Sequence, residues 1–165
     1  MSRIRPAQEA DVPVILELIH ELARYEKEPD AVKTTEAQLH SALFGPTPAV
    51  FAHVAEDDGT VQGFALWFRN FSTWEGVHGI YLEDLYVRPE ARGAGHGKAL
   101  LQTLARHAVD HGYARVEWAV LNWNEPSIGF YRSLGARPQD EWSTFRLTGE
   151  ALREFGAARP AGVPS

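Results

Sequence analysis

A short glycine-rich segment between a strand-like run and a helix-like run constrains the fold of this chain more than any other feature. The run from Val77 to Val87 is long and rich in β-branched and aromatic residues, as strands are. The segment Arg92-Gly93-Ala94-Gly95-His96-Gly97 follows, and leucines at helical spacing come after it. Alternate glycines next to a helix N-terminus expose backbone N–H groups, which hold phosphates. The sequence therefore predicts a strand–loop–helix unit that binds a phosphorylated ligand.

The spelling of this loop excludes two common phosphate-binding motifs. A Walker loop needs Gly at the position of Arg92 and Ser or Thr at that of Ala99. A dinucleotide fingerprint spaces its glycines G-x-G-x-x-G, whereas this chain has G-x-G-x-G. Taken alone, the loop leaves a flexible turn without a ligand as the alternative.

The rest of the chain predicts one mixed α/β domain with an antiparallel front half. The order is strand, two helices, three strands, helix, strand, helix and strand, with a last short helix. We expect the domain to span residues 1–156 and a flexible tail to span 157–165. The predicted strands are Arg3–Pro6, Ala49–Glu56, Val61–Phe68, Val77–Val87, Arg115–Leu121 and Trp142–Leu147, and the predicted helices start at Asp11, Thr35, Gly97, Asn124 and Thr148.

Charge and composition narrow the possible partners. The chain has 16 Lys and Arg against 22 Asp and Glu, a net charge of −6, which argues against nucleic acid and suits a cationic small molecule. It has no cysteine, which excludes disulfides, Cys-bound zinc and thiol nucleophiles. No apolar run is long enough to span a bilayer, and Met1 to Pro6 has no secretory apolar region. We expect a cytoplasmic protein with no membrane contact.

A second motif opens the helix that begins after Asn124. Asn124, Ser127 and Tyr131 recur at helical spacing and therefore share one face. Asn124 and Tyr131 are roughly 10 Å apart along the helix axis, about the reach of a pantetheine arm. Without other information, Tyr131 fits a core position better than a catalytic one.

Two other residue patterns indicate neither a metal site nor a hydrolase. His107 and His111 have the spacing of a helical metal pair, but no Glu completes an H-E-x-x-H motif. Ser127 and Ser133 lack the G-x-S-x-G elbow of a hydrolase. We expect no metal.

Taken together, these motifs resemble the GNAT acetyltransferase superfamily. The strings from Leu18 to Glu26, from Tyr81 to Val87 and from Trp123 to Ser127 are similar to its spermidine/spermine (diamine) and thialysine acetyltransferase branch. The resemblance covers roughly residues 3–155. It implies an α/β GNAT fold, a mixed and mostly antiparallel sheet splayed around an acetyl-CoA site with helices on both faces. It also implies transfer from acetyl-CoA to a primary amine of a small polyamine, diamine or thialysine-like substrate, and a homodimer.

The resemblance also implies roles for particular residues. Tyr131 matches the general acid and Glu83 the proposed base of the family. The positions that match substrate contacts are Tyr25, Glu26, Glu83, Glu117, Trp118 and Ala119, although the last three differ in type from the relatives. The positions that match CoA contacts are Leu85, Tyr86, Val87, Arg92, Gly93, Ala94, Gly95, His96, Gly97, Lys98, Asn124, Glu125, Pro126 and Ser127.

Elementary chemistry limits what Glu83 can do. An ordinary ammonium has a pKa near 10.4, about six units above that of an ordinary Glu, so Glu83 suits a water-relayed proton better than a direct transfer. Alternation along a strand would put Glu83 and Asp84 on opposite faces. Trp74 and Glu28 are equally compatible with an amine site and with structural roles. Acetylation of another amine, on an amino acid or a protein lysine, and a non-catalytic CoA-binding module remain the alternatives.

Overall fold

The computed structural model describes residues 2–162, which divide into two compact units, residues 1–121 and 122–165. The first unit holds a five-stranded sheet in the order β1-β2-β3-β4-β5. Its strands are β1 (Ser2–Pro6), β2 (Phe51–Asp57), β3 (Thr60–Ser72), β4 (Val77–Val87) and β5 (Val116–Glu117). Its helices are α1 (Val12–Tyr25), α2 (Glu36–Phe44) and α3 (His96–Asp110), with 3-10 turns η1 (Glu9–Asp11) and η2 (Pro89–Ala91).

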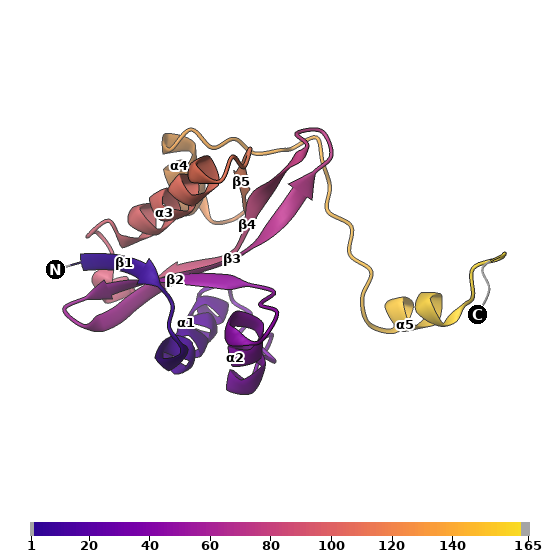
Figure 1. The fold of residues 1–165 in the computed structure, drawn as a ribbon, viewed down its shortest axis with the longest axis horizontal. Coiled ribbons are helices and arrows are strands. Elements are labelled where there is room, and N and C mark those ends of the chain that lie inside the picture. Colours follow the sequence, from indigo (N-terminus) through magenta and orange to yellow (C-terminus); the bar gives the residue numbers. More distant parts are fainter. Residues whose placement is uncertain (1, 163–165) are drawn as a thin grey trace. The chain divides into compact units, whose positions relative to one another are not determined.

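The sheet is antiparallel from β1 to β4, and only β5 runs parallel to its neighbour. Helices α1 and α2 cover one face, and α3 covers the other (Figure 1). Ile15 and Leu18 of α1 and Phe64 of β3 are fully buried on the face covered by α1 and α2. Leu100 and Leu104 of α3 are fully buried on the other face. The predicted mixed sheet with helices on both faces is confirmed within this unit.

Local sequence signals explain most of these boundaries. Thr35 caps α2 through a reciprocal capping box with Gln38, as predicted. Asp58 and Gly59 both have positive φ, 49° and 82°, which matches the tight turn that joins two antiparallel strands. Asp11 precedes α1 as predicted but does not cap it with its side chain. Its carboxylate instead accepts two hydrogen bonds from Arg5, at 2.7 and 3.0 Å, and ties α1 to β1.

The predicted strand Arg115–Leu121 is largely wrong. Only Val116 and Glu117 form ladder pairs with β4, at Ile80 and Tyr81. Apolar periodicity does not reveal where a strand loses its neighbour, because pairing depends on the geometry of both strands. Ala105 on α3, predicted to face inward, is exposed.

The second unit contains α4 (Glu125–Ser133) and α5 (Gly149–Ala157). The predicted strand Trp142–Leu147 is wrong, since these residues form no ladder with any strand in the described part of the chain. The segment has a strand-like sequence, but a strand exists only where a second strand satisfies its backbone groups. Ala157, the first residue of the predicted tail, closes α5, and residues 163–165 lie outside the described range. None of the helices within residues 2–162 is both long and apolar enough to cross a membrane.

Candidate active site

The end of β4 has an open side, and this opening is the frame of the candidate site. β5 pairs with β4 only at Ile80 and Tyr81. From Leu82 to Val87, no strand within residues 2–162 pairs with β4 on the β5 side. The Val87 carbonyl on this side accepts a hydrogen bond from Arg92, and the other backbone groups that face it have no strand partner and could pair with a bound ligand. Leu85, Tyr86 and Val87, predicted to contact CoA, lie on this open stretch.

A shift of register occurs where the opening begins. Leu82 of β4 lies opposite Trp67 of β3, and Asp84 lies opposite Leu66, the residue just before Trp67. Glu83, between Leu82 and Asp84, therefore has no partner position on β3 and is the additional residue. Such an irregularity bends a strand and interrupts the alternation of its side chains. The prediction that Glu83 and Asp84 point to opposite faces stays a prediction. Glu83 is exposed and Asp84 is half-buried, and the charge of Glu83 acts on Asp84.

Carboxylates gather around this shift. Burial, followed by the negative charges of Glu83 and Glu26, raises the pKa of Asp84 to about 7. Burial also raises the pKa of Glu26. Burial and the charges of Glu83 and Glu117 raise the pKa of Tyr81. Because each acid disfavours the ionised form of its neighbours, a cation placed among them would relieve the repulsion.

Asp84 is the functional candidate that sequence reasoning missed. Its adjacency to Glu83 was visible, but strict alternation assigned it to the other face. Burial, the largest cause of its raised pKa, and the nearby charge of Glu26 become visible only in the folded structure.

The end of α1 is held against the end of β4 by an ion-pair network. Arg88, just after β4, donates to Glu17 at 2.9 Å and to Glu21 at 3.2 Å. The hydroxyl of Tyr86 also donates to Glu21, at 3.3 Å. This network holds the helix whose last residue is Tyr25 and which Glu26 follows. The network explains how Glu26, which follows α1, comes to lie near Asp84 of β4 although the two are remote in sequence.

Arg92 connects the glycine loop to both of these elements. Its Nε donates to the carbonyl oxygen of Val87 at 2.9 Å. Its guanidinium carbon lies 5.4 Å from the ring centroid of Tyr25 and 5.5 Å from that of Tyr86. Cation–π contacts of this kind fix the side chain while its remaining N–H groups stay available. The loop, the open half of β4 and the end of α1 therefore form one continuous region.

The glycine loop has the geometry that an anion requires. Gly93 and Gly95 have φ of 91° and 85°, and no atom lies within 4 Å of where a side chain on either would begin. Gly95 is the N-cap of α3, whose first N–H groups have no partner within the helix. Lys98 is exposed in the first turn. These features fit the pyrophosphate of the acetyl-CoA implied by the sequence resemblance.

His96 lies in the loop with its side chain buried. Only 2% of its surface is exposed, and its Nδ1 lies 3.0 Å from the hydroxyl oxygen of Ser2. Among residues 2–162 its Nε2 has no hydrogen-bond partner, and it lies 3.8 Å from a carboxylate oxygen of Asp57. The predicted CoA contact of His96 stays a prediction, and the burial of the side chain leaves the backbone as the part that could make it.

Of the three predicted substrate residues on the β5 side, Glu117 lies near the acidic group. Glu117 pairs with Tyr81 in the β4–β5 ladder, accepts a hydrogen bond from Asn70 at 3.4 Å and lies 3.8 Å from Arg115. Trp118 is half-buried and Ala119 is exposed just beyond β5. Glu117 therefore joins the acidic group through Tyr81, while roles for Trp118 and Ala119 stay predictions.

The remaining predicted residues belong to the second unit. Asn124 is buried and caps α4 by accepting a hydrogen bond from the Ser127 N–H at 3.4 Å. Glu125 and Pro126 are exposed in the first turn, and Tyr131 is half-buried, with its ring 5.7 Å from that of Phe130. The predicted cap and shared helix face are confirmed. Convergence of Tyr131 with the acids of β4 stays a prediction.

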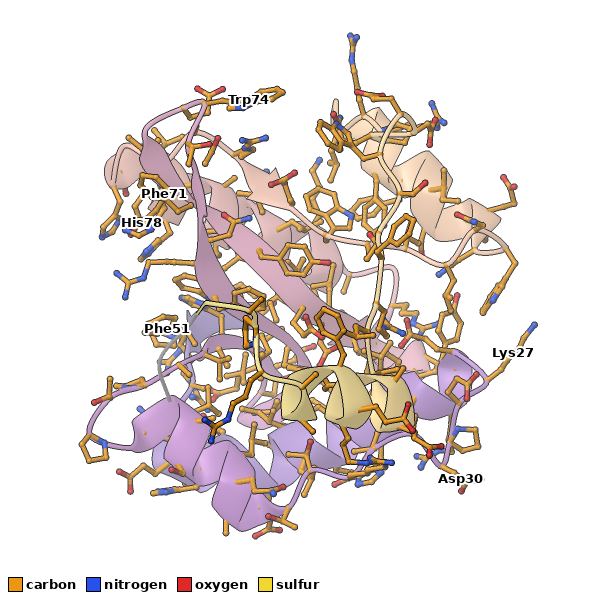
Figure 2. The ribbon with its side chains drawn as sticks, turned by 90° about the vertical axis from the view of Figure 1, so that its right-hand side faces the viewer. Lys27, Asp30, Phe51, Phe71, Trp74 and His78 are labelled. Atoms are coloured by element: carbon orange, nitrogen blue, oxygen red, sulfur yellow. The ribbon has the colours of Figure 1, made fainter. Side chains whose placement is uncertain are left out.

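Trp74 lies away from this region. It is 84% exposed at the tip of the β3–β4 hairpin, and Figure 2 shows it at the top of the view, whereas Lys27, which follows α1, lies at the right edge. Glu28 is exposed. Within residues 2–162 there is no group of three or more His, Cys, Asp or Glu side chains arranged to hold a metal ion.

Comparisons with known proteins agree with this geometry. The model of the acetyltransferase (GNAT) family matches residues 15–136. A thialysine N-epsilon-acetyltransferase of Bos taurus is 43% identical over 92% of this chain and 95% of its own length. An L-ornithine N5-acetyltransferase of Arabidopsis thaliana is 34% identical over 92% of this chain and 86% of its own. Among solved structures, an integron cassette protein from the mobile metagenome of V. cholerae aligns with a TM-score of 0.80 at 27% identity, covering 95% of this chain and 98% of that one.

Proposed function

The chain belongs to the GNAT acetyltransferase family, and we propose that it transfers acetyl from acetyl-CoA to the primary side-chain amine of a small cationic substrate of the thialysine type. The acetyl-transfer reaction follows from the family and its curated relatives. The substrate class is our proposal, supported by relatives that are named for thialysine and for ornithine. Both of these are amino acids with a side-chain ammonium.

The acidic group at the register shift of β4 carries this proposal. Glu26, Glu83 and Asp84 interact at the point where β4 loses its partner strand. An ammonium among them would be attracted by each ionised carboxylate. The same carboxylates would be poorly suited to an anionic acceptor. The site therefore selects a cation and holds it beside the open backbone of β4.

Removing a proton from that ammonium is the first chemical requirement. Transfer from a group with a pKa near 10.4 to an ordinary Glu is uphill by about 8 kcal/mol, whereas transfer to a group with a pKa of about 7 is uphill by about 5 kcal/mol. Asp84 is thus the better-matched acceptor, and Glu83 is exposed enough to orient a water. We assign the proton to this pair, with Asp84 as its more basic member.

The leaving thiolate must then be protonated. Bound acetyl-CoA supplies the acetyl thioester, and the glycine loop with Arg92 and Lys98 would hold its phosphates. Backbone N–H groups on the open half of β4 would polarise the thioester oxygen. The Tyr131 hydroxyl is the proposed donor of a proton to the departing sulfur, a role that suits a phenol because phenols have a reference pKa near 10.

A polyamine or diamine is the second candidate acceptor. It also presents a primary ammonium, and its further cationic amines would suit an acidic site. The two candidates differ in one respect, because an amino acid carries an α-carboxylate that a polyamine lacks. Exposed cations near the end of α1, such as Lys27, would discriminate between them.

We also propose a homodimer in the cytoplasm, with no nucleic acid or membrane partner. Support for association comes from apolar side chains of the second unit, since Phe145 is 94% exposed and Phe155 is 75% exposed. Large exposed apolar side chains favour burial against another surface. The net charge of −6 supports the absence of a nucleic-acid partner.

Thiol release from acetyl-CoA tests the proposed reaction. The acceptors are thialysine, lysine, ornithine, putrescine and spermidine, with a control that lacks amine. Because the protein has no cysteine, every thiol detected comes from CoA. Release that depends on thialysine or ornithine supports the proposal, and release with polyamines alone would replace the substrate class. Binding of CoA without release for any of the amines would contradict the proposed acceptor.

A further inference from the structure

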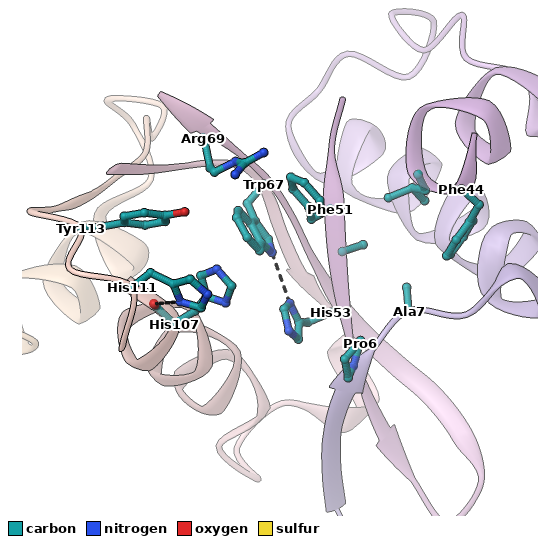
Figure 3. A pocket seen from close by; sticks show the side chains of 12 residues that line it. Pro6, Ala7, Phe44, Phe51, His53, Trp67, Arg69, His107, His111 and Tyr113 are labelled. Carbon is teal, nitrogen blue, oxygen red and sulfur yellow. Dashed lines mark hydrogen bonds between the residues drawn. The ribbon is translucent and has the colours of Figure 1, made fainter. Parts of the chain in front are cut away.

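A hollow separate from the acidic site lies beside the C-terminal end of α3. It has a volume of about 500 Å³, within the range of small-molecule sites. Figure 3 shows side chains from β2, β3, α3 and the loop after α3 converging on it. None of the residues assigned to acetyl transfer lines it. The lining residues are Pro6, Ala7, Leu43, Phe44, Phe51, Ala52, His53, Trp67, Arg69, His107, His111 and Tyr113.

Flat rings form the walls of this hollow. The Trp67 ring centroid is 4.9 Å from that of Phe51 and 4.9 Å from that of His107. The Trp67 indole also donates to Nδ1 of His53 at 3.2 Å (Figure 3). His107 and His111 stack with centroids 3.9 Å apart. Trp67 is itself buried, with 3% of its surface exposed, so the rings open to a ligand are those of Phe51 and His107, which are half-buried. These two rings favour a planar aromatic ligand, because they offer offset and edge-to-face contacts.

The charges of the hollow have one sign. Its lining contains Arg69 and three histidines, and none of the described lining residues is Asp or Glu, although the chain as a whole is acidic. The guanidinium of Arg69 lies 5.5 Å from the Phe51 ring centroid, and no carboxylate of residues 2–162 forms an ion pair with it. An arginine held over a ring without an acidic partner presents its N–H fork to a carboxylate.

The histidines would respond to such an anion. Burial, followed by the charge of His107, lowers the pKa of His53. Burial, His111 and Arg69 lower the pKa of His107, and Asp110 on the same helix partly opposes them. The sides formed by α2 and by the end of β1 contribute no titratable lining group. A bound anion would favour the protonated imidazoles, so binding would take up protons and strengthen as pH falls.

We propose that this hollow is a second ligand site, specific for a planar aromatic carboxylate, with Arg69 pairing the carboxylate and Phe51 and His107 contacting the ring. The site is independent of the proposed acetyl acceptor. Its ligand would be an anion, whereas the proposed acetyl acceptor at the acidic group is a cation.

Titration of the whole protein with naphthoate, followed by imidazole NMR and calorimetry, tests this proposal. Naphthamide serves as the neutral analogue, and inorganic phosphate serves as an anion without a ring. We expect saturable naphthoate binding that shifts the His53 and His107 signals and tightens as pH falls from about 8 to about 6. Arg69→Gln should weaken binding about tenfold, the range of one charge-assisted contact. Arg106→Gln, on α3 but outside the hollow, should leave it unchanged.

Four results would overturn the proposal. Equal binding of naphthamide would mean that the carboxylate is not recognised, and equal binding of phosphate would mean that the ring is not. Absence of saturable binding to the unaltered protein at about pH 6 would exclude the site. Should Arg69→Gln not fold, His107→Gln provides the second variant, and naphthoate binding that it leaves unchanged would equally contradict the assignment. These readouts are binding readouts, so they are independent of acetyl transfer.

Discussion

The two units of this chain differ in what they do with their apolar side chains. The first unit buries Ile15, Leu18, Phe64 and Leu104 almost completely between the sheet and its helices. The second leaves Leu147 52% exposed and Phe145 94% exposed, and its two helices contain no buried residue. A core of the first kind sustains itself, whereas exposed apolar side chains of the second kind gain from a further surface.

The proposed chemistry is divided along the same line. The acids, the glycine loop and the open strand belong to the self-contained unit, while Tyr131 belongs to the other. The proposed charge selection therefore lies in the unit with the buried core, and the proposed last proton transfer lies in the unit that exposes its apolar side chains. Substitutions in each unit can test this division.

Tyr131→Phe should have the largest effect. Loss of a positioned general acid lowers kcat/KM by about 10²- to 10³-fold, while CoA affinity and thermal unfolding stay unchanged. Steady-state thiol release and calorimetry with CoA measure these quantities. Tyr113→Phe, in the first unit and outside the acidic group, serves as the matched control. Unchanged turnover in Tyr131→Phe would remove chemistry from the second unit and with it the proposed division.

Asp84→Asn should follow in size. In the unaltered protein, kcat/KM for the amine should rise as pH increases through about 7, because ionised Asp84 attracts the ammonium and accepts its proton. The variant should lose roughly tenfold or more in kcat/KM and lose this rise. Asp30→Asn, an exposed acid after α1, is the control. A pH profile that keeps its rise in Asp84→Asn would return the role to Glu83 alone.

The same substitution should stabilise the fold. A carboxyl whose pKa is raised on folding binds its proton more tightly in the folded protein. Its favourable contribution is therefore complete below about pH 4, and the free energy of unfolding falls as pH rises toward about 7. Asp84→Asn should accordingly increase the free energy of unfolding at about pH 8 by on the order of 2 kcal/mol. Urea unfolding at several pH values measures this, and an equal gain at about pH 4 would indicate a cause other than ionisation.

Phe145→Ser should weaken self-association without unfolding the first unit. Removing one exposed aromatic from an interface weakens dimerisation by about 2 kcal/mol, roughly thirtyfold in the dissociation constant. Light scattering across a dilution series measures the effect, with near-ultraviolet circular dichroism as the check on folding. Arg153→Gln on exposed α5 is a polar control. A monomer in the unaltered protein would refute the proposed dimer directly.

The smallest effect is expected from His96→Leu. The imidazole is buried with Nε2 unsatisfied, so an apolar replacement should leave stability unchanged or raise it by up to about 1 kcal/mol, despite loss of the Ser2 contact. Affinity for CoA should not change, because the side chain faces away from the loop surface. Thermal unfolding and calorimetry give both values, and a marked loss of CoA affinity would place His96 in the cofactor site after all.

The sequence was most informative where local chemistry decides the structure. The capping box at Thr35, the positive-φ glycines of the loop and the bounds of β4 all depend on neighbouring residues, and all were predictable. The site was harder, because β5 is shortened and Asp84 acquires its pKa through contacts remote in sequence. Glu26 and Arg92 could be nominated by resemblance, but their common environment is visible only once α1 packs on the sheet. Burial of His96 was equally invisible, since the residue stands at the junction between an exposed loop and the first turn of α3.

Glu83 is the additional residue that makes the pairing of β4 with β3 irregular. Ladder pairing is continuous on either side of it, so deletion of this one position would let the two halves of β4 join in regular phase. Such a shortened strand would lose the local bend that an additional residue introduces, together with the carboxylate of Glu83. A single residue thus separates a regular antiparallel ladder from the irregular one at the candidate site.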